Sequence, residues 1–195
     1  MHSREIIGLL LALGVLSAVA PAARTAEAPT LEQAAIDQTP PRLSFVDGQV
    51  SFWRPGAQHW AQAQVNTPLA PGDQLSTASP GNLELQIGVR AFVRGWVNTQ
   101  IGLENQEPDY LQFKVTAGSA AFDLRGLERG QMVEVDTPNA AFTIEHPGYY
   151  RVEVAGERTS FITRRAGRAT LIPASGEVVV IAPSEEVVIT GVVSP

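Results

Sequence analysis

The chain has 195 residues, of which 44% are hydrophobic, so it can bury one or two compact cores and is not composed like a disordered protein. Its formal net charge of −6 argues against nucleic acid or an anionic membrane as a partner, because those partners require a basic face. The sequence contains no cysteine, which excludes disulfides, thiolate metal sites and cysteine nucleophiles.

The N-terminal region has the pattern of a secretory signal. A short segment, Met1–Arg4, precedes an uninterrupted run of apolar and small residues from Ile6 to Ala20, and small residues at Ala20 and Ala22 suit a signal peptidase. The run is shorter than the roughly 20 residues that a membrane-spanning helix needs. We therefore predict a cleaved signal peptide over residues 1–22, export to the periplasm of a Gram-negative bacterium, and no stable membrane insertion after cleavage. A retained membrane anchor is the alternative.

Residues 23–41 are rich in Ala, Pro, Thr and Gln, and only Leu31–Gln38 has a helix-like pattern. Prolines flank that patch on both sides, at Pro29 and at Pro40 and Pro41. This composition indicates a linker, with a short docking helix as the alternative.

After Pro41 the apolar residues alternate with polar ones, which is the period of a β-strand. Asp47-Gly48 lies between two such runs and favours a two-residue hairpin turn. Further short runs follow, separated by glycine and proline. They are 83–87, 91–93, 111–115, 120–124, 133–135, 142–144 and 150–154. The sequence therefore predicts an all-β domain of short strands over residues 42–172.

A weak internal repeat, in which a glycine, an apolar run, a proline and a second apolar run succeed one another, occurs at 72–85, 130–144 and 176–189. Its unequal spacing favours an irregular, solenoid-like coil of short strands. A plain β-sandwich is the alternative. Residues 173–195 are predicted to form C-terminal strands or a tail.

Several segments together resemble a FecR-type periplasmic domain, and the likeness extends from about Pro41 to Ile172. The segments are 65–77, 83–85, 111–124, 133–140 and 147–152. FecR proteins couple a siderophore-loaded outer-membrane transporter to a sigma factor through a cytoplasmic anti-sigma segment. Only Met1–Glu5 precedes the apolar run here, so that segment is not matched. The resemblance implies a periplasmic, solenoid-like β-module of the standalone type, whose function is unassigned, with an envelope protein as its partner.

The residues that could carry chemistry are few. Outside the signal peptide, His59 and His146 are the only imidazoles, and no nucleophile elbow, zinc-peptidase helix or phosphate loop occurs. The cluster from Asp136 to Asn139 fits a strand-ending turn, and Asp73 is expected to lock the turn before the strand at Leu75. We therefore predict no catalytic residue, no metal and no cofactor, and hence no enzyme activity.

Candidate partner-binding residues are Trp53, Arg164 and Arg168. Trp53 precedes Arg54-Pro55-Gly56 and is expected to be more exposed than Trp60 and Trp96, for which burial is expected. The only basic cluster is Arg164, Arg165 and Arg168, although strand alternation would place Arg164 and Arg165 on opposite faces, which favours a merely solvated surface.

The sequence thus indicates a non-catalytic periplasmic binding or signalling module of FecR type that interacts with another envelope protein. The alternative is a β-domain that binds cell-wall glycan or peptidoglycan through aromatic side chains.

Overall fold

The structure is a computed structural model that describes residues 39–127, 130–173 and 177–191. All regular secondary structure in these ranges is β, which confirms the predicted all-β fold. The strands are β1 (Arg42–Trp53), β2 (Ala61–Gln62), β3 (Gln74–Ile87), β4 (Ala91–Gly95), β5 (Gln100–Glu107), β6 (Tyr110–Leu124), β7 (Met132–Asp136), β8 (Ala141–Ile144), β9 (Gly148–Ala155), β10 (Arg158–Arg164), β11 (Ala169–Ile172), β12 (Val179–Ile181) and β13 (Glu186–Thr190).

The predicted signal peptide and most of the predicted linker, up to residue 38, lie outside the described residues. Within the described ranges, no helix has the length and hydropathy needed to cross a bilayer.

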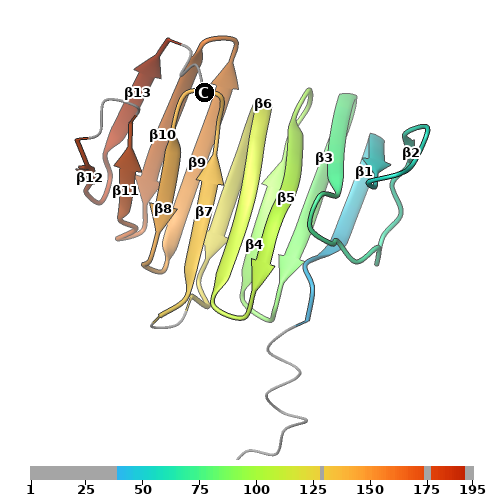
Figure 1. Cartoon of the computed structure of the whole chain (residues 1–195), viewed down its shortest axis with the longest axis horizontal. Helices are drawn as coiled ribbons and strands as arrows, with labels where there is room; N and C mark the ends of the chain where they lie inside the picture. Colours follow the sequence, from blue (N-terminus) through green and yellow to red (C-terminus); the bar gives the residue numbers. More distant parts are fainter. Residues whose placement is uncertain (1–38, 128–129, 174–176, 192–195) are drawn as a thin grey trace, which may run out of the picture.

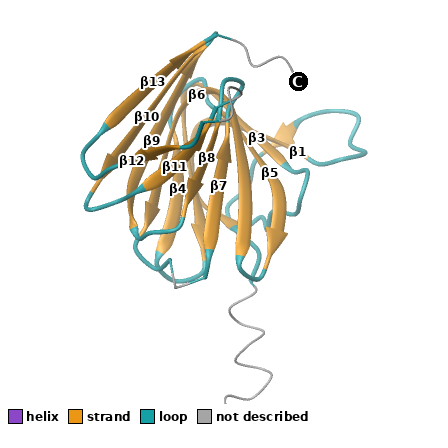
Figure 2. Ribbon diagram, turned by 60° about the vertical axis from the view of Figure 1, so that its left-hand side comes forward, coloured by secondary structure: helices purple, strands orange, loops and turns teal. Residues whose placement is uncertain are grey.

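The strands form one sheet that is folded into two layers, which Figures 1 and 2 show from two directions. Layer A has the order β2-β1-β3-β5-β6-β7-β8-β11-β12. Layer B has the order β1-β3-β4-β6-β9-β10-β13. The long strands β1, β3 and β6 appear in both orders, because one half of each strand belongs to each layer.

The passage of β6 from one layer to the other occurs at Gly118. Residues up to Ala117 pair with β5 in layer A, and the residues from Gly118 onward pair with β9 in layer B. Gly118 has a φ of +81°, and a Cβ at this position would lie 2.5 Å from the Cα of Thr99. Only glycine fits this combination of left-handed backbone and close approach.

The bend in β1 corrects the prediction of a hairpin at Asp47-Gly48. The strand continues through these residues and pairs with β3 on both sides of them, with a register shift between Gly48 and Val50. Gly48 has a φ of +69°, and a Cβ there would collide with the carbonyl oxygen of Pro80. A glycine at a bulge inside a strand gives the same local sequence signal as a glycine in a turn. The prediction of a hairpin here was therefore wrong.

The internal repeat does not correspond to equivalent structural units. The first segment comprises the end of the turn before β3 and most of that single strand, whereas the second is the β7–β8 hairpin. The third includes β12 and β13, which pair with β11 and β10 instead of with each other. Alternating strands separated by glycine and proline resemble one another whatever their pairing, so the repeat in the sequence does not reflect a repeat in the structure.

The core lies between the two layers and forms one continuous cluster of buried apolar side chains. The rings of Phe142 in β8 and Phe161 in β10 stack with centroids 4.1 Å apart and join the layers. Phe113 and Phe122 lie in the two halves of β6 and meet edge to face at 5.7 Å, because the bend at Gly118 folds the strand over on itself. Aromatic pairs of this kind add to the stabilisation that apolar burial provides.

Two buried polar side chains tie the turns together. The Tyr150 hydroxyl donates to the His146 carbonyl at 2.6 Å and accepts from the Arg168 amide at 3.1 Å, and burial raises its pKa to about 12. Asn139 donates to the carbonyls of Glu157 at 3.0 Å and Gly191 at 2.5 Å. The predicted turn at residues 136–139 is confirmed, and its asparagine also binds the β9–β10 turn and the residue that follows β13.

Candidate binding surface

The outward side of layer B carries a group of arginines, aromatic residues and carboxylates that we call the arginine face. Alternate residues of β4 and β9 are buried, so the residues between them point outward. The arginine face consists of Glu84, Phe92, Arg94, Trp96, Asp123, Arg125, Tyr149, Arg151 and Arg165.

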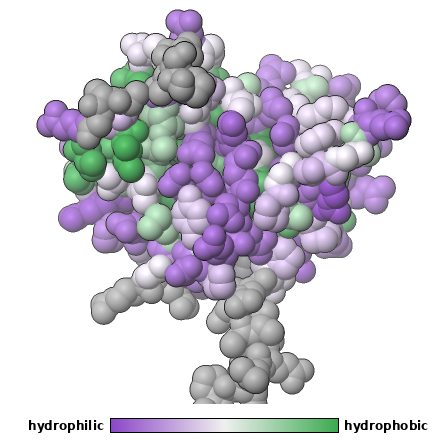
Figure 3. Space-filling model, viewed as in Figure 1, coloured by the Kyte–Doolittle hydropathy of each residue, from purple (hydrophilic) through white to green (hydrophobic). Residues whose placement is uncertain are grey.

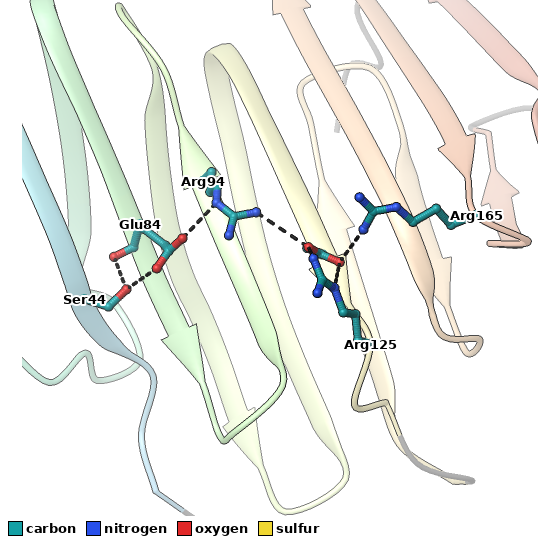
Figure 4. A network of polar contacts seen from close by, with 6 residues as sticks. Ser44, Glu84, Arg94, Arg125 and Arg165 are labelled. Carbon is teal, nitrogen blue, oxygen red and sulfur yellow. Dashed lines mark hydrogen bonds and ion pairs between the residues drawn. The ribbon is translucent and has the colours of Figure 1, made fainter.

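Asp123 is the centre of this face, and three arginines converge on it (Figure 4). Arg125 donates to it in bidentate fashion at 3.0 and 2.7 Å, Arg165 donates at 3.3 Å, and Arg94 lies 3.6 Å away. Asp123 is paired in register with outward-facing Phe92 and Tyr149, yet it is only 1% exposed because the arginines cover it. The hydrogen bonds from Arg125, with the charges of all three arginines, lower the pKa of Asp123 despite its burial.

The polar network continues from Arg94 across the sheet. Arg94 donates to Glu84 at 2.8 Å, and the Ser44 hydroxyl donates to the same carboxylate at 2.8 Å. The contacts therefore connect β1, β3, β4 and β6 with the turn after β10, segments that are far apart in the sequence (Figure 4).

Aromatic rings hold the arginines from the side. The guanidinium of Arg94 lies 5.5 Å from the ring centroid of Phe92, that of Arg151 5.6 Å from Trp96, and that of Arg165 5.4 Å from Tyr149. Such contacts stabilise a cation over a ring by about 0.5–1 kcal/mol at exposed sites.

The side chains of these arginines remain partly accessible to solvent. The side chains of Arg94, Arg125 and Arg165 are 38, 57 and 60% exposed. The face thus presents cations in fixed positions to solvent.

Arg165 belongs to this face because it lies outside the strand. Its φ is +54° and that of Ala166 is +61°, so the chain turns immediately after β10 ends at Arg164. Strand alternation therefore does not apply, and the expectation that Arg164 and Arg165 must point to opposite faces was wrong.

A shallow hollow of about 410 Å³ borders the arginine face. Exposed Phe45 and Trp96 stand among its lining residues together with the polar side chains of Asp47, Asn82 and Glu84. Aromatic walls with polar groups between them are the arrangement by which proteins hold sugar rings.

The structure separates the three predicted binding residues. Arg164 pairs with Tyr149 and lies at the border of the arginine face, whereas Arg168 immediately precedes β11 in layer A. Trp53 ends β1 on the opposite side of the molecule (Figure 1). It is half-buried, and its indole nitrogen donates to the Ala57 carbonyl at 3.0 Å.

The exposures expected for the tryptophans are reversed. Trp60 and Trp96 are exposed, although burial was expected for both. Trp60 lies in the loop between β1 and β2, and Trp96 follows the last residue of β4. Neither tryptophan is therefore part of a strand that would direct its side chain into the core. Alternation could have placed Phe92 with Arg94 and Asp123 with Arg125, but nothing in the sequence brings Arg94 and Arg165 to Asp123.

The two histidines and Asp73 are not part of the arginine face. His59 and His146 are both exposed. Asp73 accepts from the Ala70 amide at 2.8 Å and from Arg54, so it locks the turn before β3 as predicted. Among the residues that the structure describes, no group of three His, Asp or Glu side chains is arranged to hold a metal ion.

Glu134 and Asp136 form a carboxylate pair on the outward side of layer A. Gln112 donates to both, at 3.1 and 2.8 Å. Burial and the neighbouring charge of Asp136 raise the pKa of Glu134, and burial together with Glu134 raises the pKa of Tyr110 to about 12.

A second cavity, of about 520 Å³, lies where the chain enters the domain and several turns meet. Its walls combine apolar Leu111 and Leu124 with charged Arg90, Arg125 and Asp109.

Comparison with known proteins finds similarity in structure alone. No family model matches the chain, and no curated protein matches it. The chain is similar to two crystal structures, at 2.50 and 1.65 Å resolution, of a putative anti-sigma factor from Parabacteroides distasonis ATCC 8503. Both comparisons give a TM-score of 0.52 and cover 60% of this chain and 54% of the other, with sequence identities of 16 and 15%. At this identity the similarity shows a shared fold.

Proposed function

We propose that this protein is a non-catalytic binding and signalling module of FecR type, which works in the periplasm by contacting another envelope protein through the arginine face. The observation that carries the proposal is the convergence of Arg94, Arg125 and Arg165 on one buried carboxylate, with their side chains partly exposed. Arginine and aromatic residues are the types that most often dominate the energy of protein interfaces.

Two further observations support this function. The fold is similar to that of chains described as an anti-sigma factor, whose role is regulatory. The N-terminal sequence has the pattern of a secretory signal, which supports the periplasmic location.

The arginine face is preorganised for binding. Ion pairs and aromatic contacts already fix the arginines, so a partner need not pay the full entropy of ordering long side chains. A carboxylate of the partner would complete the coordination of Arg125 and Arg165 on their exposed sides.

Site-specific photo-crosslinking in the bacterial envelope tests the proposal. A photoreactive residue at position 96 should give a discrete adduct with another protein, and the same residue at position 89, in the exposed β3–β4 turn, is the matched control. The substitutions Arg94→Gln and Arg165→Gln together should reduce the adduct about tenfold or more, since they remove two interface arginines. An adduct of unchanged yield in that variant would contradict the proposal.

Glycan binding is a second candidate, favoured by the hollow between Phe45 and Trp96. Sedimentation with purified peptidoglycan sacculi distinguishes the two functions. Co-sedimentation that is lost in Trp96→Ala but retained in the arginine double variant would favour the glycan and not the protein partner.

A further inference from the structure

The two ends of the sandwich differ in how their edge strands are covered. The edge of β1 is occupied by the chain itself, because β2 pairs with it and the following loop donates from the Asn66 amide to the Leu43 carbonyl at 2.7 Å. This loop also places Leu69 in the core. At the other end, β12 pairs only with β11 and β13 pairs only with β10 within the described residues. We call this second end the open end.

The core is incompletely covered at the open end. Ile181 of β12 is fully buried, and Val179, two residues earlier on the same side of the strand, is 41% exposed. Val187 and Ile189 of β13 pack against the core and are only partly buried. Side chains that face the interior are thus exposed where the next strand of each layer would lie.

The outward side of the open end is also apolar. Val180 is 68% exposed, and Ile172, Val178 and Val188 are exposed as well. Figure 3 shows hydrophobic side chains gathered over the side of the molecule that holds β11, β12 and β13. Natural proteins normally protect an edge strand with charge, proline or a covering segment, whereas the three residues of β12 itself are all apolar, and an apolar edge is a template for strand addition.

Charge at the open end identifies the kind of strand that would fit. From Glu177 to Gly191 the sequence contains three glutamates and no lysine or arginine. Glu177, Glu185 and Glu186 are all exposed. A second copy of this chain would bring these carboxylates together, which is unfavourable, whereas basic residues on a partner would pair with them.

We propose that the open end binds an extended segment of a partner protein by strand addition, the segment having a β-branched apolar centre flanked by lysine or arginine. This inference rests on the proposed function, because it assigns a second contact to the same protein partner. The added strand would hydrogen-bond to the edge of β12 that pairs with no other strand of the described chain, and its alternate side chains would cover Val179 and complete the core.

The test uses a fluorescein-labelled peptide, Lys-Lys-Val-Thr-Val-Thr-Val-Lys-Lys. The protein is the chain without the predicted signal peptide, residues 23–195. Fluorescence anisotropy should show saturable binding, and hydrogen exchange should show new protection of the amides of β12. The substitution Val179→Lys should weaken binding at least tenfold, because it places a charge at the exposed margin of the core. If Val179→Lys unfolds the chain, Val180→Lys is the second test variant, because it places the same charge on β12 at a more exposed residue.

The matched control is Val89→Lys, which makes the same change at a residue that is 83% exposed in the β3–β4 turn and should leave binding unchanged. A peptide with glutamates in place of the four lysines should bind at least tenfold more weakly.

Three results would overturn the inference. The first is peptide binding that Val179→Lys leaves unchanged. The second is a homodimer that dissociates in the Val179→Lys variant, which would show that a second copy of this chain occupies the open end. The third is β12 protected as strongly as β6 in the free protein, which would show that the chain itself covers this end.

The crosslinking experiment at position 96 separates this inference from the proposed function. Loss of the adduct in the arginine double variant, with peptide binding insensitive to Val179→Lys, would leave the proposed function standing and remove the strand-addition site alone.

Discussion

Asp123 is the residue on which the arginine face depends. It is buried, and it neutralises guanidinium groups from the end of β6, from β4 and from the turn after β10. Its removal would leave these cations close to one another without their shared counter-ion. A substitution of Asp123 should therefore affect both the stability of the protein and its binding to a partner.

We predict that Asp123→Asn lowers the free energy of unfolding at pH 7 by about 2 kcal/mol, less than for a fully buried pair because the arginines remain partly solvated. Urea unfolding followed by circular dichroism measures the change. Asp47→Asn, at an exposed residue of β1, is the control and should cost less than about 0.5 kcal/mol. Equal losses in the two variants would contradict a central role for Asp123.

The pH dependence of this difference has a definite sign. The pKa of Asp123 in the folded protein lies below its ordinary value of 3.8, so the unfolded chain binds this proton more readily. The contribution of Asp123 is therefore present above about pH 4 and is lost as the pH falls through the folded pKa. The stability gap between the wild type and Asp123→Asn should narrow on going from about pH 5 to about pH 2.

Glu134 is predicted to behave in the opposite way. Burial and Asp136 raise its pKa, so the folded protein binds this proton more readily than the unfolded chain, and the ionised form costs stability at neutral pH. Glu134→Gln should therefore stabilise the protein at pH 7 by about 0.5 kcal/mol, the size of a like-charge pair on a sheet surface. The gain should disappear as the pH falls below the raised pKa of Glu134. Thermal unfolding over a pH series measures this, with Glu107→Gln as the control, and a stabilisation that grows at low pH would refute it.

At the scale of the element, the bends in the long strands determine the fold. Each of β1, β3 and β6 supplies a half-strand to both layers, so a defect at one bend disturbs two layers at once. The glycines at these bends therefore differ in importance from the glycines in the hairpin turns.

Gly118→Ala should prevent folding or cost about 3 kcal/mol or more, since the new Cβ would approach the Cα of Thr99 to 2.5 Å at a positive φ. Gly156→Ala, in the β9–β10 turn, also has a positive φ, of +60°, but its Cβ would meet nothing within 4 Å. It should cost about 1 kcal/mol. Similar unfolding midpoints for the two variants would show that the bend at Gly118 tolerates a side chain.

The same bends mark the limit of what the sequence predicts about the elements. The alternation of apolar and polar residues correctly predicted strands at Leu111 and at Phe122, because this pattern depends only on which residues face the core. It could not show that they are one strand, because Gly118 interrupts the pattern in the way that a turn would. Pairing between distant strands decides that question, and pairing leaves no local signal.

Much of the candidate site was hidden for a related reason. Arg164 was predicted from the basic cluster and does border the arginine face, but Asp123 lies in an apolar run, and only Arg125 among its three arginine partners is near it in the sequence. The site consists of residues brought together by register across β4, β6 and β9. Sequence spacing predicts which side of a strand a residue occupies, and it does not predict which strands are neighbours.

At the scale of the whole molecule, stability should decrease from the centre of the sheet toward the open end. β6 has neighbouring strands on both sides in each layer, whereas β12 and β13 have a neighbour on one side within the described chain. Regions with fewer contacts open with lower free energies.

Native-state hydrogen exchange should therefore find the slowest amides in β6 and much faster exchange in β12. The capped end supplies the comparison, since β1 is also near an end but is covered by β2 and the loop that follows it. We expect β1 to exchange more slowly than β12. Uniform protection from β1 to β12 would contradict this gradient and would also weaken the case for an open end.

The three strands that cross between the layers have a mechanical consequence. Because continuous backbone connects one layer with the other, the layers cannot slide or separate without breaking β1, β3 and β6 at their bends. A partner seated on layer B would therefore change the molecule's shape very little. We therefore expect the module to signal by binding alone, either by recruiting one protein or by blocking its access to another. We expect no change in the module's own conformation on binding.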